Sequence, residues 1–323
     1  MLTDMPLEAL RSYRSAQTEP EDFTAFWDGT LEEAASHPLD LRVERVASVL
    51  SAVEVYDVTF AGFAGQPVRG WYRRPAGVSG ALPTVVQYVG YGGGRGYAEE
   101  SLLIAASGFG HFHMDTRGQG ASWGIGDTPD AGPLPPQVPG VMTRGIRSRE
   151  DYYYRRLITD AVRAVDAAAA LNGVDAGHIG VQGGSQGGGL ALAVAGLRPD
   201  IAAMAAFVPF LCDFPRALLV TDAYPYREVG DYLHIHRGEV AEVHETLRYF
   251  DGVNFAKHAT APAYLSAALM DRICPPSTVF GAFHEYRGPK ELEVWPYNGH
   301  EGGAIEDERN ALAFFQRTLG SAD

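Results

Sequence analysis

Residues 178–193 read HIGVQGGSQGGGLALA and hold one serine, Ser185, among six glycines. The segment HIGVQ before the serine is short and apolar, which predicts a buried strand, and GGGLALAVAGL after it predicts an apolar helix. A tight strand-to-helix turn lifts a serine hydroxyl above the sheet and points a helix N-terminus at developing negative charge. The stretch therefore predicts an α/β fold in which Ser185 is a nucleophile.

The spacing G-x-S-x-G occurs twice, at 183–187 and at 120–124, so it does not select a serine by itself. Ser122 is followed by GIGDTPDAGPLPP, which is too rich in glycine and proline for a helix. A phosphate-binding loop is disfavoured, because no Lys-Ser or Lys-Thr pair follows and G-x-G-x-x-G is absent. Ser185 is the serine with the required context.

A serine nucleophile needs a base and an orienting acid, and α/β-hydrolases carry them in the chain order serine, Asp or Glu, His. Six histidines follow Ser185, and His300, in YNGHEGG, comes directly after the expected strand ELEVWPY. Asp271 follows the expected strand APAYLSAAL, so both side chains emerge at the edge of the sheet that carries Ser185. The alternative for Asp271 is a helix N-cap ahead of Pro275 and Pro276.

An oxyanion hole takes one N–H from the residue after the nucleophile and one from the loop after an earlier strand. These residues are Gln186 and, in the loop GYGGGRG that follows TVVQYV, Tyr91. A tight turn without a ligand role is the alternative for that loop. The glycines are expected to let the backbone approach the ligand closely.

The rest of the chain predicts an α/β-hydrolase fold with a mostly parallel central sheet and helices on both faces. Period-two patterns between residues 41 and 75 predict antiparallel strands at the N-terminal side of the sheet. We expect one domain over residues 1–323, with a helical extension at 1–40 and an insertion at 208–260 that shapes the site.

Composition excludes several function classes. The formal net charge is −14, which disfavours binding to nucleic acid or to anionic membrane surfaces. No signal segment or membrane span is recognisable, so a cytoplasmic protein is expected.

Cys212 and Cys274 are too few for a disulfide framework and are expected to be buried. The pairs His111-x-His113 and His234-x-His236 lack a third ligand at a recognised spacing, so we expect neither metal nor cofactor.

Long segments of the chain resemble the cephalosporin-C deacetylase and acetyl xylan esterase family, carbohydrate esterase family 7. The matching segments are MDTRGQG at 114–120, TRGI at 143–146, YYYRRLITDAVRAVDA at 152–167, GGSQGGGLALA at 183–193, VPFLCDF at 208–214, RYFDGVNFA at 248–256, DRICPPSTVF at 271–280 and PYNGHEGG at 296–303.

The resemblance implies that Ser185, Asp271 and His300 form a triad, with Tyr91 and Gln186 as oxyanion donors. It further implies that the RGQG segment is a structural brace and that Tyr224 and Pro225 wall a small acyl pocket. The activity it implies is deacetylation of small acetylated substrates, namely acetylated xylo-oligosaccharides and cephalosporin C, by a cytoplasmic homohexamer without metal or cofactor. The alternatives on the same fold are another short-chain carboxylesterase or peptidase and a catalytically silent carbohydrate-binding protein.

Overall fold

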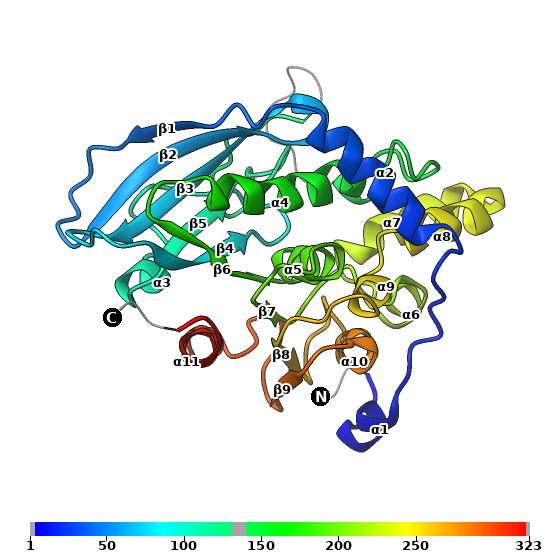
Figure 1. The fold of residues 1–323 in the computed structure, drawn as a ribbon. Coiled ribbons are helices and arrows are strands. Elements are labelled where there is room, and N and C mark those ends of the chain that lie inside the picture. Colours follow the sequence, from blue (N-terminus) through cyan, green and yellow to red (C-terminus); the bar gives the residue numbers. More distant parts are fainter. Residues whose placement is uncertain (1–3, 131–139, 321–323) are drawn as a thin grey trace.

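A single sheet of nine strands runs through the computed structural model, which describes residues 4–130 and 140–320 (Figure 1). The strands lie in the order β1-β2-β3-β5-β4-β6-β7-β8-β9. Their bounds are β1 (Arg42–Arg45), β2 (Val53–Ala61), β3 (Pro67–Pro75), β4 (Leu82–Tyr88), β5 (Gly110–Met114), β6 (Val174–Gly184), β7 (Ala203–Phe207), β8 (Ala263–Ala268) and β9 (Lys290–Trp295).

Strand direction divides the sheet into two parts. β1, β2, β3 and β5 pair antiparallel to one another in that order. From β5 through β4, β6, β7 and β8 to β9 every pairing is parallel. The expected antiparallel opening and mostly parallel centre are confirmed, and the carboxyl ends of the parallel strands share one edge, where α/β folds bind their ligands.

Helices cover both faces of the sheet (Figure 1). On one face lie α4 and α5, against residues such as Val86 and Met204; on the other lie α3 and α11, against Val85 and Ala205. Neighbouring strand residues point to opposite faces, so the continuous apolar runs of β4 and β7 supply both layers. The helix bounds are α1 (Leu7–Ser12), α2 (Phe23–Ala35), α3 (Leu103–Ala106), α4 (Tyr153–Ala169), α5 (Gln186–Leu197), α6 (Phe214–Val220), α7 (Tyr226–Ile235), α8 (Val240–Arg248), α9 (Gly252–Ala256), α10 (Pro276–Glu285) and α11 (Ile305–Leu319).

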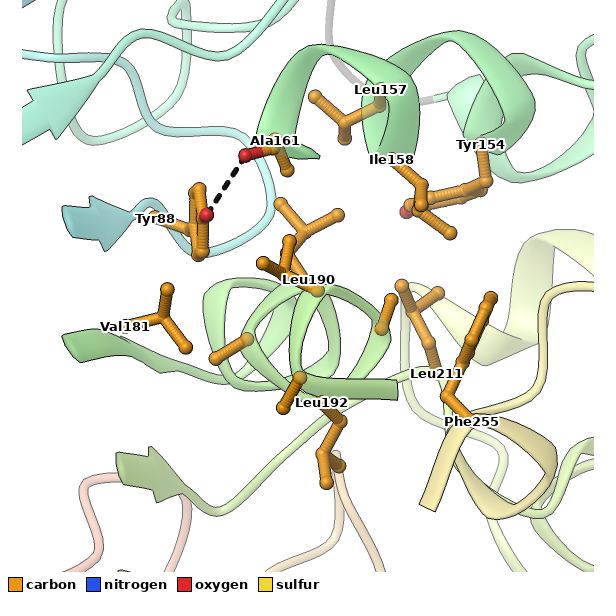
Figure 2. Packing of buried hydrophobic residues seen from close by; sticks show 14 of the residues in the cluster. Tyr88, Tyr154, Leu157, Ile158, Ala161, Val181, Leu190, Leu192, Leu211 and Phe255 are labelled. Carbon is orange, nitrogen blue, oxygen red and sulfur yellow. Dashed lines mark hydrogen bonds between the residues drawn. The ribbon is translucent and has the colours of Figure 1, made fainter. Parts of the chain in front are cut away.

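The helix that follows Ser185 is surrounded by apolar side chains. Figure 2 shows Leu190 of α5 between Tyr88, at the end of β4, and side chains of α4. The buried Tyr88 hydroxyl donates a hydrogen bond of 2.9 Å to the Ala161 carbonyl of α4. Leu190 is fully buried, and its truncation to Ala is expected to cost about 3 kcal/mol of unfolding free energy. The helix behind the serine is therefore fixed by the core.

Both segments outside the alternating pattern are helical. α1 and α2 lie within residues 1–40, and α6 to α9 lie between β7 and β8. The apolar pattern of AEESLLIAAS at 98–107 predicts a helix over this segment, but only Leu103–Ala106 is α-helical. No helix in the described part of the chain has the length and apolarity to cross a membrane.

Candidate active site

Ser185 occupies a strained turn between β6 and α5. Its backbone has φ 53° and ψ −120°, a conformation that a residue with a side chain rarely adopts. The flanking glycines give clearance: a Cβ on Gly187 would lie 2.2 Å from the Tyr88 carbonyl oxygen, and one on Gly183 would lie 2.3 Å from the Gly187 carbonyl carbon. A Cβ on Gly189 would lie 2.3 Å from the Phe210 carbonyl oxygen. The glycine run lets α5 start directly beneath the turn and contact neighbouring backbone.

The structure brings together the three residues expected as a triad. His300 Nε2 lies 3.0 Å from Ser185 Oγ, and His300 Nδ1 lies 2.8 Å from Asp271 Oδ2. The second oxygen of Asp271 accepts hydrogen bonds from the amides of Ile273 at 2.8 Å and Cys274 at 2.9 Å. Ser185, Asp271 and His300 come from the ends of β6, β8 and β9, as the sequence predicted.

This arrangement fixes the role of each nitrogen on the imidazole. The fully buried Asp271 only accepts hydrogen bonds when ionised, so it holds the proton on His300 Nδ1 and leaves Nε2 as the acceptor for the serine hydroxyl. Asp271 is not the N-cap of α10, which is Pro275. The three side chains can therefore deprotonate a hydroxyl nucleophile and return the proton to a leaving group.

Gln119 connects the two segments expected to supply the oxyanion hole. Its side-chain oxygen accepts a 2.7 Å hydrogen bond from the amide of Gly92, next to Tyr91. Its side-chain nitrogen donates at 2.9 Å to the side-chain oxygen of Gln186. Gln186 is the first residue of α5, and the first N–H groups of a helix have no acceptor within the helix. The RGQG segment thus braces both segments from behind.

Tyr91 is held at both ends. Its hydroxyl donates to Glu228 Oε1 at 2.5 Å, and its carbonyl accepts from Trp123 Nε1 at 2.7 Å. Burial, together with the Glu228 carboxylate, raises the pKa of the Tyr91 hydroxyl, which therefore stays protonated as a donor. The other oxygen of Glu228 accepts from the amide of Met142 at 3.1 Å. The position of Tyr91 is therefore determined by α7 and by the segment around Trp123.

The glycines after Tyr91 have a different role from the one predicted. A Cβ on Gly93 would lie 2.4 Å from the Trp123 ring, and one on Gly94 would lie 2.3 Å from the Gly126 Cα atom. They make room for the 123–126 segment, whereas the sequence suggested close approach to a ligand. Trp123 reaches the site because of them.

Two cavities meet at Ser185, and Gly90, Trp123 and His300 also line both. The first has a volume of about 520 Å³ and a mainly apolar wall that includes Tyr91, Tyr224, Pro225 and Ile273. Tyr224 and Pro225, which the resemblance assigns to a small acyl pocket, line this cavity, and its volume does not limit an acyl group to acetyl. The second has a volume of about 360 Å³ and is also lined by Asp307 and Glu308 of α11.

The described residues offer one group of three potential metal ligands, and it overlaps the triad. Asp271, Cys274 and His300 have ligand atoms within 4.8 Å of one another. Asp271 and His300 already bond to each other, and burial raises the pKa of the Cys274 thiol well above its usual value. Cys212 and Cys274 are free and buried, as expected.

The two histidine pairs differ. The imidazole rings of His111 and His113 on β5 stack with their centroids 5.5 Å apart. They lie on one face of the strand, as their spacing predicted. His234 lies in α7, so the extended geometry considered for His234 and His236 is wrong.

Trp123 and Glu228 are among the lining residues that sequence reasoning missed. Trp123 lies inside the second G-x-S-x-G segment, whose serine was set aside, and a lone tryptophan in a glycine-rich loop was the available signal. Glu228 has no local signal, since it lies 137 residues from its partner Tyr91.

Comparisons with known proteins point to one family. The model of the family described as acetyl xylan esterase (AXE1) matches residues 1–318. The acetyl esterase Axe7A of Xylanibacter ruminicola is 29% identical over 299 residues, covering 91% of this chain but 65% of that protein, so the chain spans less than two thirds of this relative.

Two solved structures are similar over nearly their whole length. An acetyl xylan esterase from Paenibacillus sp. R4 has a TM-score of 0.91 and 38% identity, covering 98% of this chain and 100% of that chain. Acetyl xylan esterase 1 from Thermoanaerobacterium sp. JW/SL YS485 has a TM-score of 0.88 and 32% identity, covering 97% of this chain and 99% of that chain. The α/β-hydrolase fold expected from the sequence is confirmed.

Proposed function

Because the chain belongs to the acetyl xylan esterase family, we propose that it is a serine esterase that removes acetyl groups from small acetylated substrates. Acetylated xylo-oligosaccharides are the first candidate substrates, and the acetyl ester of cephalosporin C is the second. The observation that carries the proposal is the hydrogen-bonded series from Ser185 through His300 to Asp271 at the meeting point of two cavities.

The proposed reaction has two halves. Ser185 Oγ attacks the ester carbonyl while His300 Nε2 takes its proton, and the C–O bond to the alcohol breaks as His300 returns that proton to the leaving oxygen. Water, deprotonated by His300, then attacks the acetyl-enzyme. The C–O bond to Ser185 breaks, acetate leaves, and His300 returns the proton to Ser185 Oγ. Asp271 keeps the imidazole in the correct tautomer through both halves.

The amides of Tyr91 and Gln186 are assigned to the developing oxyanion. A charge that forms only in the transition state is stabilised best by donors that are already in place. Gln119 supports this assignment, because it bonds to Gly92 and to Gln186 and so fixes the spacing of the two segments. Neither a metal nor a cofactor takes part in these steps.

A substrate panel tests this function. We expect hydrolysis of acetylated xylobiose and p-nitrophenyl acetate, slower hydrolysis of butyrate and octanoate esters, and no hydrolysis of the matching amides. The slower rates expected for longer esters rest on the family resemblance, because the apolar cavity itself has room for a longer acyl chain. Rapid cleavage of octanoate esters contradicts the acetyl preference, and rapid amide cleavage favours a peptidase on the same fold.

Assembly, location and domain organisation complete the proposal. The assembly rests on the family resemblance, the location on the resemblance and the sequence, and the single domain on the sequence. The chain is proposed to be one domain that assembles as a cytoplasmic homohexamer, a state that limits access to small substrates. Native mass spectrometry and fractionation of the source cells test assembly and location. A monomer at micromolar concentration contradicts the hexamer.

A further inference from the structure

Two glutamine side chains form a buried pair beside the two amides assigned to the oxyanion. Gln119 is 1% exposed and Gln186 is fully buried. The Gln119 amide nitrogen donates to Gln186 Oε1 at 2.9 Å, and the Gln186 amide nitrogen donates in return to Gln119 Oε1 at 3.4 Å. A side-chain amide has two hydrogens and two acceptor lone pairs, so this contact uses half of the hydrogen-bonding capacity of each side chain.

Backbone groups on both sides of Tyr91 use part of the remaining capacity. The Gly92 amide donates to Gln119 Oε1 at 2.7 Å, and the Gln186 amide nitrogen donates to the Val89 carbonyl at 3.2 Å. A backbone N–H only donates and a backbone C=O only accepts, so these two contacts determine which end of each side-chain amide is the oxygen. The glutamine pair therefore holds the loop of Tyr91 two residues before it and one residue after it.

Two neighbouring tyrosines of α4 complete the network. The Tyr154 hydroxyl, on the side of α4 that faces α5 (Figure 2), donates to Gln186 Oε1 at 2.9 Å. The Gln119 amide nitrogen donates at 2.9 Å to the Tyr153 hydroxyl, which itself donates to the Arg117 carbonyl. Both tyrosines are fully buried, and burial raises the pKa of the Tyr154 hydroxyl well above its usual value, so it stays a donor. Every hydrogen and lone pair of the two side-chain amides then has a partner.

A network without spare groups leaves the two amides a single arrangement. Turning the Gln186 amide over would place its oxygen against the Val89 carbonyl and its nitrogen against the Gln119 amide nitrogen. Such contacts leave buried polar groups unpaired, which costs free energy because the groups are shielded from water. The side chain of Gln186, the first residue of α5, is therefore fixed relative to the loop that carries Tyr91.

We infer that Tyr154 is a positioning residue for the oxyanion hole, because its hydroxyl holds the Gln186 side chain in the arrangement that sets the spacing of the Tyr91 and Gln186 amides. The inference rests on the proposed function and adds to it a residue that lines neither cavity at Ser185. Without the Tyr154 hydroxyl, Gln186 Oε1 keeps one donor, that of Gln119, and the side chain gains freedom to turn. Fewer enzyme molecules then hold both amides at the distance that the oxyanion requires.

Tyr154→Phe tests the inference, since it removes one hydroxyl and keeps the ring. We expect kcat for p-nitrophenyl acetate to fall by about 10-fold and KM to stay within about twofold, because the oxyanion forms only in the transition state. Complete removal of an oxyanion donor costs about 10²- to 10³-fold in kcat, so a displaced donor is expected to cost less. An unchanged kcat, or a change confined to KM, overturns the inference.

Tyr286→Phe is the matched control. Tyr286 is 2% exposed, its hydroxyl donates to the Ala261 carbonyl at 2.8 Å, and it lines neither cavity. Both variants lose one buried hydroxyl hydrogen bond, so thermal unfolding is expected to show similar losses of stability. Only Tyr154→Phe is expected to lose activity. An equal fall of kcat in the control would show a general effect of lost stability and overturn the role of Tyr154.

The inhibitor 1,1,1-trifluoro-2-butanone gives a readout that a loss of stability does not change. Ser185 Oγ adds to its carbonyl carbon, the serine proton passes to His300, and the carbonyl oxygen becomes an oxyanion for the two assigned amides. We expect its inhibition constant to rise by about 10-fold in Tyr154→Phe, in parallel with the fall of kcat, and to keep the wild-type value in Tyr286→Phe. An unchanged inhibition constant in Tyr154→Phe contradicts the inference.

A second substitution tests whether Tyr154 acts through Gln186. Gln186→Met keeps the backbone N–H and removes the side-chain amide that Tyr154 contacts. When Tyr154→Phe is added to Gln186→Met, we expect kcat to change by less than about twofold, because the bond that it removes is already absent. A further 10-fold fall on this background means that Tyr154 acts by another route, and the inference is then wrong.

The wild-type enzyme separates this inference from the proposed function. A wild type that neither hydrolyses p-nitrophenyl acetate nor binds the trifluoromethyl ketone overturns the serine esterase itself. A wild type that does both, with a Tyr154→Phe variant of equal kcat and equal inhibition constant, overturns only the role of Tyr154.

Discussion

The two G-x-S-x-G segments of this chain have the same spacing and different structures. Ser185 lies at φ 53° between β6 and α5, with its hydroxyl 3.0 Å from His300 Nε2. Ser122 lies in an exposed loop closed by a bridge between Ala121 and Ile125, and its amide donates to the Gly92 carbonyl at 3.2 Å. The spacing alone positions no nucleophile; the strand before the serine and the helix after it do.

The second segment nevertheless contributes to the site. Trp123 bonds to the Tyr91 carbonyl and lines both cavities, while Ile125 and Gly126 lie against Gly94. One segment therefore supplies the nucleophile, and the other supports the loop expected to stabilise the oxyanion. Substitutions in each segment separate these roles.

The largest difference is expected between the two serines. Ser185→Ala removes the nucleophile and lowers kcat/KM for p-nitrophenyl acetate by about 10⁴-fold or more. Ser122→Ala leaves it within about twofold, because this exposed hydroxyl lies outside the triad. Steady-state kinetics on both variants, with circular dichroism to confirm folding, measure the difference. A large loss in Ser122→Ala with activity retained in Ser185→Ala reverses the assignment.

The two serines also illustrate what the sequence could reveal. Ser185, Asp271 and His300 were identifiable because each follows a short apolar strand, and parallel strands end at one edge of the sheet. The fold was identifiable for the same reason, since alternating strands and helices leave few topologies.

Contacts between distant segments were not identifiable in this way. Glu228 reaches Tyr91 only because α7 folds over the loop, and its local pattern is that of an ordinary helix surface residue. The second cavity was hidden for the same reason, because its lining residues Glu100 and Glu308 are 208 positions apart in the sequence. The length of α3 was overestimated, since an apolar helical pattern does not indicate where tertiary contacts end a helix.

The glycines that close each motif give the next contrast. A Cβ at Gly187 lies 2.2 Å from the Tyr88 carbonyl oxygen, so Gly187→Ala displaces backbone and lowers the unfolding free energy by about 2 kcal/mol or more. At Gly124 the nearest atom, Gly94 N, is 3.3 Å away, and Gly124→Ala is expected to cost less than about 1 kcal/mol. Urea unfolding of the two variants, analysed with one shared m-value, measures both changes in unfolding free energy. A loss below about 1 kcal/mol in Gly187→Ala would show that the turn at Ser185 tolerates a side chain.

The hydroxyl of Tyr91 tests how firmly the oxyanion loop must be held. Tyr91→Phe leaves the buried Glu228 without its 2.5 Å donor, which frees the loop and lowers kcat by about 10-fold, with a smaller change in KM. Tyr97→Phe is the control, because Tyr97 is 62% exposed on the same loop. A change in KM alone indicates that Tyr91 binds substrate and does not position the oxyanion donor.

Trp123 gives the smallest expected effect and sharpens the role of the second segment. Trp123→Phe keeps an aromatic wall between the cavities and removes the N–H that bonds to the Tyr91 carbonyl at 2.7 Å. The tryptophan is 65% exposed, so water can replace that donor, and kcat is expected to fall by about threefold. Trp123→Ala also removes the wall, and its additional effect is expected in KM for acetylated xylobiose more than in KM for p-nitrophenyl acetate. If Phe and Ala at this position reduce kcat equally and leave KM for both esters unchanged, Trp123 acts only through its hydrogen bond to Tyr91, and the second segment supports the oxyanion loop without contacting the substrate.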